Sequence, residues 1–164
     1  MSDRWLTIDP GEDTGLSLWD GPELVDAYTV KMRDVPDLLW SWLAGEITDA
    51  SVEHGEFFAQ LQGHKLTRVV CEDWVIYPWK AKSLAWDECR TARLIGAITW
   101  IVNKFDIPVH FQGAKIKEEA VAAGAENYFL SPRHENRHAN DAIMHGVWYN
   151  LHNADQVRPG NVRP

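Results

Sequence analysis

Length and composition limit what this chain can be. It has 164 residues, 45% of them hydrophobic, which is enough for one well-packed core and too few for two ordinary domains. We therefore expect one domain over residues 1–155 and a flexible tail over 156–164, where prolines, a glycine and arginines gather. No apolar run approaches the roughly 18 residues of a membrane span, and the N-terminus lacks the regions of a signal peptide. Both observations favour a cytoplasmic protein without a membrane partner.

Charge is distributed unevenly along the chain. The formal net charge is −8, which by itself disfavours a nucleic-acid partner, because phosphate binding normally depends on Lys and Arg. Residues 1–64, however, carry 3 basic and 13 acidic side chains, whereas residues 65–164 carry 13 basic and 11 acidic ones. The second part can therefore present a basic surface to DNA. A solvated acidic surface without a partner is the alternative.

The first strand and its turn organise the N-terminal part. Residues 5–9 form an apolar, β-rich run that ends on Asp9, is broken by Pro10-Gly11 and resumes at residues 16–19, a pattern typical of a hairpin. Residues 23–30 continue as a third strand, so the sequence predicts an antiparallel meander. Asp9 would then lie at the end of a rigid strand, although ordinary Asp-Pro-Gly turn chemistry also explains it.

Two helices and a central strand are expected next. Asp34 is placed to cap a helix that ends at Gly45, and a second helix is predicted over about residues 50–62. Residues 67–75 then form a nearly continuous apolar run, which is typical of a buried central strand. Two acids interrupt this run near its far end.

Glu72 is the informative residue of that strand. A buried glutamate is costly unless it is paired, so its place after Val-Val-Cys requires a cation or a position at the strand end. The alternative is a strand that simply ends at Cys71. Asp73 would point to the opposite face of the sheet, and we leave it out of the candidate site.

A loop and a long helix follow. Residues 77–82 mix aromatics with lysines, a composition that suits stacking on bases and equally suits covering a core edge. The helix predicted over 83–104 has one stripe of small residues and one of bulky apolar residues, so we expect it to pack on two sides. The small stripe consists of Ala85, Cys89, Ala92 and Gly96, and the bulky one of Leu94, Ile98, Ile101 and Phe105.

The last part of the chain ends in a helix with a polar face. A strand over 107–111, a short helix over 114–123 and a linker over 125–133 precede a helix that begins at His134 or Asn136 and ends at His152. At about 100° per residue, four side chains of this helix share a narrow face. They are His134, His138, Asp141 and His145.

Three interpretations of this face are open. It can be an ordinary solvated surface, or a zinc site made of its three histidines, although no cysteine accompanies them. It can also join carboxylates elsewhere in the chain to form a Mg²⁺ or Mn²⁺ site, because carboxylate oxygens and imidazole nitrogens suit those ions. The residues of that last site are Asp9, Glu72, His138 and Asp141.

Four short motifs, which occur in the same order as in the family, make the chain resemble the RNase H-like nuclease superfamily. Within it, the chain resembles the RuvC-type Holliday junction resolvases. Asp9-Pro10-Gly11 and Thr14-Gly15 are similar to the end of that family's first strand. Glu72 stands where the family has its central-strand glutamate, and Asp141-Ala142 matches an Asp-Ala pair on the closing helix. His138 stands where many members have an aspartate, and Lys117 matches a lysine that lies near the scissile phosphate.

The resemblance implies a fold and an activity. The fold would be α/β, with a mixed five-stranded sheet of three antiparallel strands and then two more, flanked by helices. The catalytic residues would be Asp9, Glu72, His138, Asp141 and Lys117. All but Lys117 would bind two Mg²⁺ or Mn²⁺ ions, and His138 would either ligate a metal or act on the water. The partner would be branched DNA, above all the four-way junction, cut by a homodimer with the small-residue stripe as a plausible contact.

Other activities are compatible with the same residues. The short chain and its nine tryptophans suggest a phage or prophage version, which would act in the host cytoplasm. An RNase H-type or flap-processing nuclease could use the same metal core, since fold does not dictate function. A noncatalytic DNA-binding module and a zinc hydrolase are the alternatives from other classes.

Overall fold

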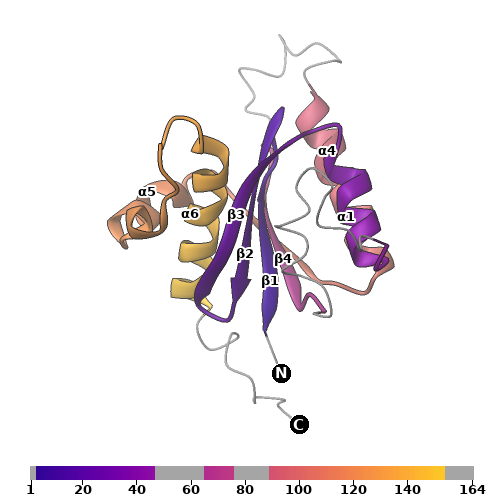
Figure 1. The fold of residues 1–164 in the computed structure, drawn as a ribbon, viewed down its shortest axis with the longest axis horizontal. Helices are drawn as coiled ribbons and strands as arrows, with labels where there is room; N and C mark the ends of the chain where they lie inside the picture. Colours follow the sequence, from indigo (N-terminus) through magenta and orange to yellow (C-terminus); the bar gives the residue numbers. More distant parts are fainter. Residues whose placement is uncertain (1–2, 47–64, 76–88, 154–164) are drawn as a thin grey trace.

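The computed structural model describes residues 3–46, 65–75 and 89–153. Within these ranges, five strands form one sheet in the order β3-β2-β1-β4-β5, with helices on both faces (Figure 1). The strands are β1 (Arg4–Asp9), β2 (Asp13–Asp20), β3 (Glu23–Lys31), β4 (Arg68–Glu72) and β5 (Val109–Gln112). The helices are α1 (Val35–Leu43), α4 (Arg90–Lys104), α5 (Ile116–Ala122) and α6 (Arg137–His152), with a 3₁₀ turn η2 (Ala125–Tyr128).

The sheet is mixed, which confirms the predicted fold class. β1 pairs antiparallel with β2, and β2 with β3, whereas β4 lies parallel to both β1 and β5. Parallel neighbours bring their carboxyl ends to the same edge of a sheet, which is where open α/β folds place their sites. The last residues of the parallel neighbours β1, β4 and β5 are Asp9, Glu72 and Gln112.

The alternating direction of side chains along each strand determines on which face of the sheet each side chain lies. In β1, Leu6 and Ile8 belong to the core shared with α1 and α4, whereas Trp5 belongs to the core shared with α6. Because side chains alternate with a period of two, Asp9 lies on the same face as Trp5 and therefore faces α6. The same alternation in β4 sends Glu72 to the α6 face. Figure 1 shows α5 and α6 on this side of the sheet and α1 and α4 on the other.

Several boundaries differ from the prediction. Asp34 is at the N-cap position of α1, but it makes no side-chain capping bond, and its carboxylate lies 3.3 Å from Nε of Arg33 instead. β4 ends at Glu72 and does not reach residue 75, and α6 begins only at Arg137. Gly45, with φ +73°, follows α1 as predicted, because glycine adopts this left-handed conformation without strain.

Some predictions lie outside the described residues. These are the helix over 50–62, the loop over 77–82, the first residues of the helix over 83–104 and the tail over 156–164. In the described part of that long helix, Leu94, Ile98 and Ile101 are buried in the core, which confirms the bulky stripe. Gly96, of the small stripe, has no atom of the described residues within 4 Å of the place where a Cβ would be.

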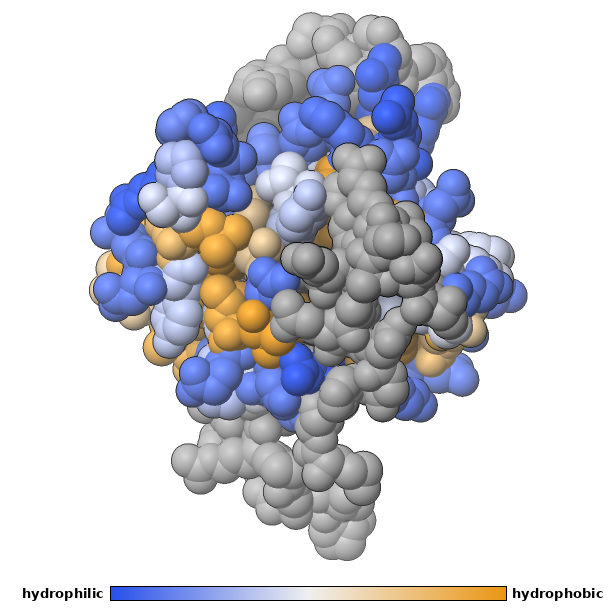
Figure 2. Space-filling view, in the orientation of Figure 1, coloured by the Kyte–Doolittle hydropathy of each residue, from blue (hydrophilic) through white to orange (hydrophobic). Residues whose placement is uncertain are grey.

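The visible surface is largely hydrophilic over the described residues (Figure 2). An apolar area lies on the left of that view, where α6 and β3 lie in Figure 1. On the α5–α6 side, the large apolar side chains with the most exposure are Val121, Tyr128 and Leu151. Among the described helices, none combines the length and the apolar character needed to cross a membrane.

Candidate active site

The close approach of α6 to β2 makes the site possible. Gly15 of β2 pairs with Asp9 of β1, and a Cβ on Gly15 would lie 1.8 Å from the backbone carbonyl oxygen of His138. No real contact is that short, so only glycine allows the first turn of α6 to touch the sheet here. Further along, a Cβ on Gly146 would lie 2.3 Å from ring atoms of Trp19. The two glycines bring α6 close enough to place its side chains beside the end of β1.

A chain of buried hydroxyls joins the sheet to α6. The indole Nε1 of Trp19 donates to Oγ of Ser17 at 2.8 Å, and the hydroxyls of Ser17 and Thr7 bond to each other. Thr7 then donates to the carbonyl oxygen of Ala142 at 2.8 Å. Because Ala142 follows Asp141, these bonds fix the turn of α6 that carries the carboxylate.

We expect Thr7→Val to lower the free energy of unfolding by about 1 to 3 kcal/mol, because it removes the only hydroxyl that links the Ser17 side chain to the Ala142 carbonyl in these bonds. Urea unfolding of the purified protein measures this change. Thr29→Val is the matched control, since the buried Thr29 hydroxyl has no hydrogen-bond partner among the described residues, and its loss should therefore cost almost nothing. Equal losses of stability in the two variants would contradict the assignment.

Three carboxylates and one ammonium meet at this edge of the sheet. Nζ of Lys117, on α5, lies 2.9 Å from Oδ1 of Asp9, 2.9 Å from Oε2 of Glu72 and 3.6 Å from Oδ2 of Asp141. The side chains are partly withdrawn from solvent, with exposed fractions of 11% for Asp9, 19% for Glu72 and 19% for Asp141. Lys117 offsets part of the repulsion that would otherwise oppose gathering three acids in one place.

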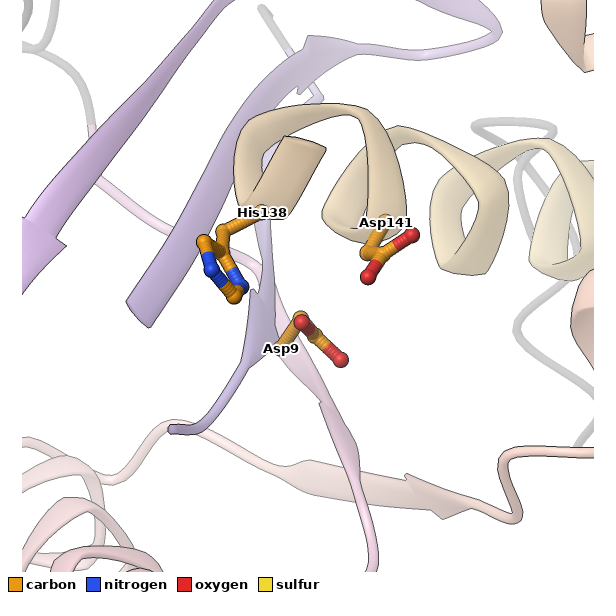
Figure 3. A group of neighbouring side chains, drawn as sticks. All are labelled: Asp9, His138 and Asp141. Carbon is orange, nitrogen blue, oxygen red and sulfur yellow. The ribbon is translucent and has the colours of Figure 1, made fainter. Parts of the chain in front are cut away.

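His138 and Asp141 approach Asp9 from the helix. Figure 3 shows Asp9 near the end of its strand, with both α6 side chains on the side that faces it. Single ligand atoms of Asp9, His138 and Asp141 lie within 4.8 Å of one another, and the same is true of Asp9, Glu72 and His145. Carboxylate oxygens with imidazole nitrogens fit Mg²⁺ or Mn²⁺, and Asp9 belongs to both sets.

The carboxyl groups of Asp9 and Glu72 differ in how readily they ionise. Burial, together with the neighbouring Glu72, raises the pKa of Asp9 to about 7, and Lys117 offsets only part of this shift. Burial also opposes ionisation of Glu72, but hydrogen bonds from His145, Asp9 and Lys117 outweigh it and lower the pKa of Glu72 to about 2. Glu72 is therefore the ionised member of the pair, and Asp9 is the one that retains a proton more readily.

Comparisons with known proteins bear on the fold. No known family model and no curated protein matches the sequence. Among solved structures, T. thermophilus RuvC in complex with a Holliday junction substrate is similar, with a TM-score of 0.61 and 16% sequence identity over 94% of this chain and 97% of that chain. A second Thermus thermophilus RuvC structure has a TM-score of 0.56 and 17% identity over the same shares. This chain has a RuvC-type fold.

The RuvC-type fold brings together all five of the predicted site residues. Asp9 and Glu72 come from the carboxyl ends of two parallel strands, and Lys117 reaches them from α5. His138 and Asp141 come from the first turns of α6, three residues apart, and therefore point to the same side. Their roles in metal binding and catalysis stay predictions.

The prediction that His134 shares the polar face of the closing helix is wrong. α6 begins at Arg137, so His134 precedes the helix and does not follow its periodicity. Its side chain is 81% exposed, and its Nε2 lies 3.4 Å from Oε1 of Glu135. Among the described residues, His134 belongs to neither group of side chains that could hold a metal ion, so the three-histidine zinc site does not form in this RuvC-type fold.

Two polar residues of the site were missed by the sequence analysis. His145 is completely buried, and its Nε2 lies 2.7 Å from Oε2 of Glu72 while its Nδ1 lies 2.8 Å from Oε1 of Gln112. Burial lowers the pKa of His145, and Glu72 opposes that shift only in part. The helical spacing from Asp141 indicated His145, but only as part of the zinc interpretation. Nothing in the sequence distinguishes Gln112 from an ordinary residue at the end of a strand.

Proposed function

We propose that this chain is a metal-dependent endonuclease that cleaves branched DNA, with the four-way junction as its principal substrate. The observation that supports it most is the convergence of Asp9, Glu72, His138 and Asp141 at the carboxyl ends of two parallel strands in a RuvC-type fold. The similar T. thermophilus RuvC was solved with a Holliday junction substrate, which supports the same class of substrate for this chain.

Each of these side chains would have its own role in phosphodiester hydrolysis. Asp9, Glu72, His138 and Asp141 would hold two Mg²⁺ or Mn²⁺ ions, with Asp9 shared because its carboxylate lies with His138 and Asp141 in one group and with Glu72 in the other. When bound, divalent ions lower the pKa of an attacking water and stabilise the departing 3′ oxygen, which leaves a 5′ phosphate. Lys117 would balance the charge that develops on the phosphate, since its ammonium already lies among the carboxylates.

A homodimer is the assembly that suits this substrate. A four-way junction presents equivalent strands, so two copies of the site can cut them in a symmetric complex. The exposed side of α4 is a candidate contact, because Gly96 lies there with Ala92 and Cys89 one and two turns earlier. Sedimentation of the purified chain with and without a junction measures the assembly.

A side-by-side cleavage assay tests the proposed function. The purified chain is incubated with a four-way junction, a flap, a linear duplex and an RNA–DNA hybrid, each in Mg²⁺, Mn²⁺ or EDTA. We expect the junction to be cut fastest, with 5′-phosphate products and no cleavage in EDTA. Faster cleavage of the hybrid or flap would point to an RNase H-type or flap-processing enzyme, and junction binding without cleavage in either metal to a noncatalytic module. Zinc found in the purified protein would point to a zinc hydrolase.

Lys117→Gln should slow cleavage of the junction by on the order of 10²-fold at saturating Mg²⁺, because the charge that develops on the phosphate would lose the ammonium group that lies among the carboxylates. The Mg²⁺ concentration that gives half the maximal rate should fall, since the ammonium no longer competes for the same carboxylates. Rates measured across a Mg²⁺ series give both quantities.

Lys115→Gln is the control for this prediction, because Lys115 is an exposed lysine two residues away at the N-cap of α5. It should leave both the rate and the Mg²⁺ requirement unchanged. If Lys117→Gln behaves like Lys115→Gln, the assigned role of Lys117 is wrong.

A further inference from the structure

Two buried polar side chains, His145 and Gln112, lie next to Glu72. His145, on α6, has no exposed surface, and its two ring nitrogens contact Oε2 of Glu72 at 2.7 Å and Oε1 of Gln112 at 2.8 Å. Glu72 and Gln112 are register partners at the ends of β4 and β5, so both side chains point to the face that α6 covers. The imidazole therefore bridges two adjacent strand ends.

The donors and acceptors around the ring restrict where its proton can lie. A neutral imidazole donates from one nitrogen and accepts at the other, whereas an ionised carboxylate only accepts. The 2.7 Å contact with Glu72 is therefore attractive when Nε2 carries the proton. A doubly protonated ring would place a buried positive charge beside the Lys117 ammonium, which lies 2.9 Å from the same oxygen of Glu72.

Gln112 can supply the donor that the other ring nitrogen then needs. With Nε2 protonated, Nδ1 is an acceptor, and the two ends of a glutamine amide have nearly the same shape. The amide nitrogen of Gln112 is buried in a residue that is only 6% exposed, and it has no hydrogen-bond partner in the part of the chain that the structure describes. Turning the amide by 180° brings this nitrogen to the position 2.8 Å from Nδ1 and so satisfies a buried donor.

We propose that His145 and Gln112 are positioning residues, which hold Glu72 through a proton on Nε2 of His145 and an amide N–H of Gln112 on Nδ1, and that His145 is not a metal ligand. The consequence for cleavage depends on the proposed nuclease function, whereas the hydrogen-bond assignment does not.

A neutral donor suits this task better than Lys117 does. An arriving divalent cation repels the Lys117 ammonium but not a neutral imidazole, so the bond from His145 can persist when metal binds. Hydrogen bonds of this kind orient ligating carboxylates, and their removal typically costs on the order of 10- to 100-fold in metal affinity or activity.

The assignment is tested by long-range ¹H–¹⁵N NMR of the full chain with ¹⁵N-labelled histidine rings. The chain has seven histidines, and the His145 signals are those missing from His145→Gln. We expect the Nε2–H tautomer without metal and the same tautomer at saturating Mg²⁺. An Nδ1–H tautomer in either condition would overturn the proposal, because Nε2 would then be free to ligate the ion directly.

Variants add a functional readout. Gln112→Leu and His145→Leu should each raise the dissociation constant for Mn²⁺, measured by calorimetry, by on the order of 10- to 100-fold. His145→Gln should recover much of that loss, because its amide can donate to Glu72 in place of the imidazole. His152→Leu, on the exposed last turn of the same helix, is the control and should bind Mn²⁺ normally.

The outcomes separate the two proposals. If the wild-type chain cuts no substrate but the tautomer and the Mn²⁺ affinities are as expected, the proposed nuclease function fails and the positioning pair stands. If Gln112→Leu folds and binds Mn²⁺ as tightly as wild type, the positioning role is wrong even for an active nuclease. Circular dichroism of each variant shows whether it has folded, and if the leucine variants do not fold, the NMR result decides the case, because it needs only the wild-type chain and His145→Gln.

Discussion

Replacing Asp9 by asparagine will reduce Mg²⁺-dependent cleavage of a four-way junction by on the order of 10³-fold or more while leaving the fold intact. Asp9 belongs to both candidate ligand sets, so its loss affects everything that the site is proposed to bind. Asparagine keeps the shape but presents only one neutral oxygen, which neutralises no cation. The measurement is the single-turnover rate of cleavage with enzyme in excess.

The stability of Asp9→Asn shows whether a loss of cleavage comes from the missing carboxylate or from a disrupted fold. Because burial and Glu72 raise the pKa of Asp9 to about 7, the ionised form of Asp9 is disfavoured in the folded, metal-free chain. A neutral side chain of the same shape should therefore cost no stability there. We expect the melting temperature of Asp9→Asn without metal to equal or exceed that of wild type, and binding to the junction in EDTA to be retained.

Asp141→Asn should likewise lose Mg²⁺-dependent cleavage, and Asp73→Asn provides the control. Asp73 is an exposed acid that directly follows Glu72 but lies outside both ligand sets. The Asp73→Asn variant should therefore cut the junction at the wild-type rate. If purified Asp9→Asn and Asp141→Asn both keep Mg²⁺-dependent activity, the proposed catalytic site is incorrect.

Gly15→Ala will destabilise the protein by about 3 kcal/mol and slow cleavage by on the order of 10²-fold. The added Cβ would lie 1.8 Å from a backbone oxygen of His138 and 2.4 Å from its carbonyl carbon. Backbone atoms cannot rotate away as the end of a flexible side chain can, so α6 must move off β2. That movement carries His138 and Asp141 away from Asp9, and small displacements of reacting groups cost large factors in rate.

Gly96→Ala is the matched control for this steric argument. Gly96 lies inside α4, where an added Cβ would meet no atom of residues 3–46, 65–75 or 89–153 within 4 Å. Alanine should therefore raise the free energy of unfolding by roughly 0.5 to 1 kcal/mol through its better helix propensity. Urea unfolding of both variants and single-turnover cleavage by Gly15→Ala test the prediction. A Gly15→Ala protein as stable and active as wild type would show that α6 does not depend on this close approach.

The sequence by itself determined the order of the elements and the strands that carry the acids. Apolar runs rich in β-formers identify β1 and β4, and Asp9 and Glu72 lie at or near the end of these runs. The spacing of three between His138 and Asp141 places them on one side of a helix whatever that helix packs against. Local geometry is sufficient for these statements, because a period depends only on the backbone of its own element.

Only the tertiary structure decided which of these side chains meet, and what surrounds them. Periodicity shows which residues share a helix face but not what that face contacts, and the contact here depends on Gly15 and Gly146 letting α6 approach the sheet. Because β5 lies beside β4 and α6 covers both strand ends, Gln112 and His145 become the partners of Glu72. Such contacts join segments far apart in the chain, and they exist only once the sheet and its helices have packed together.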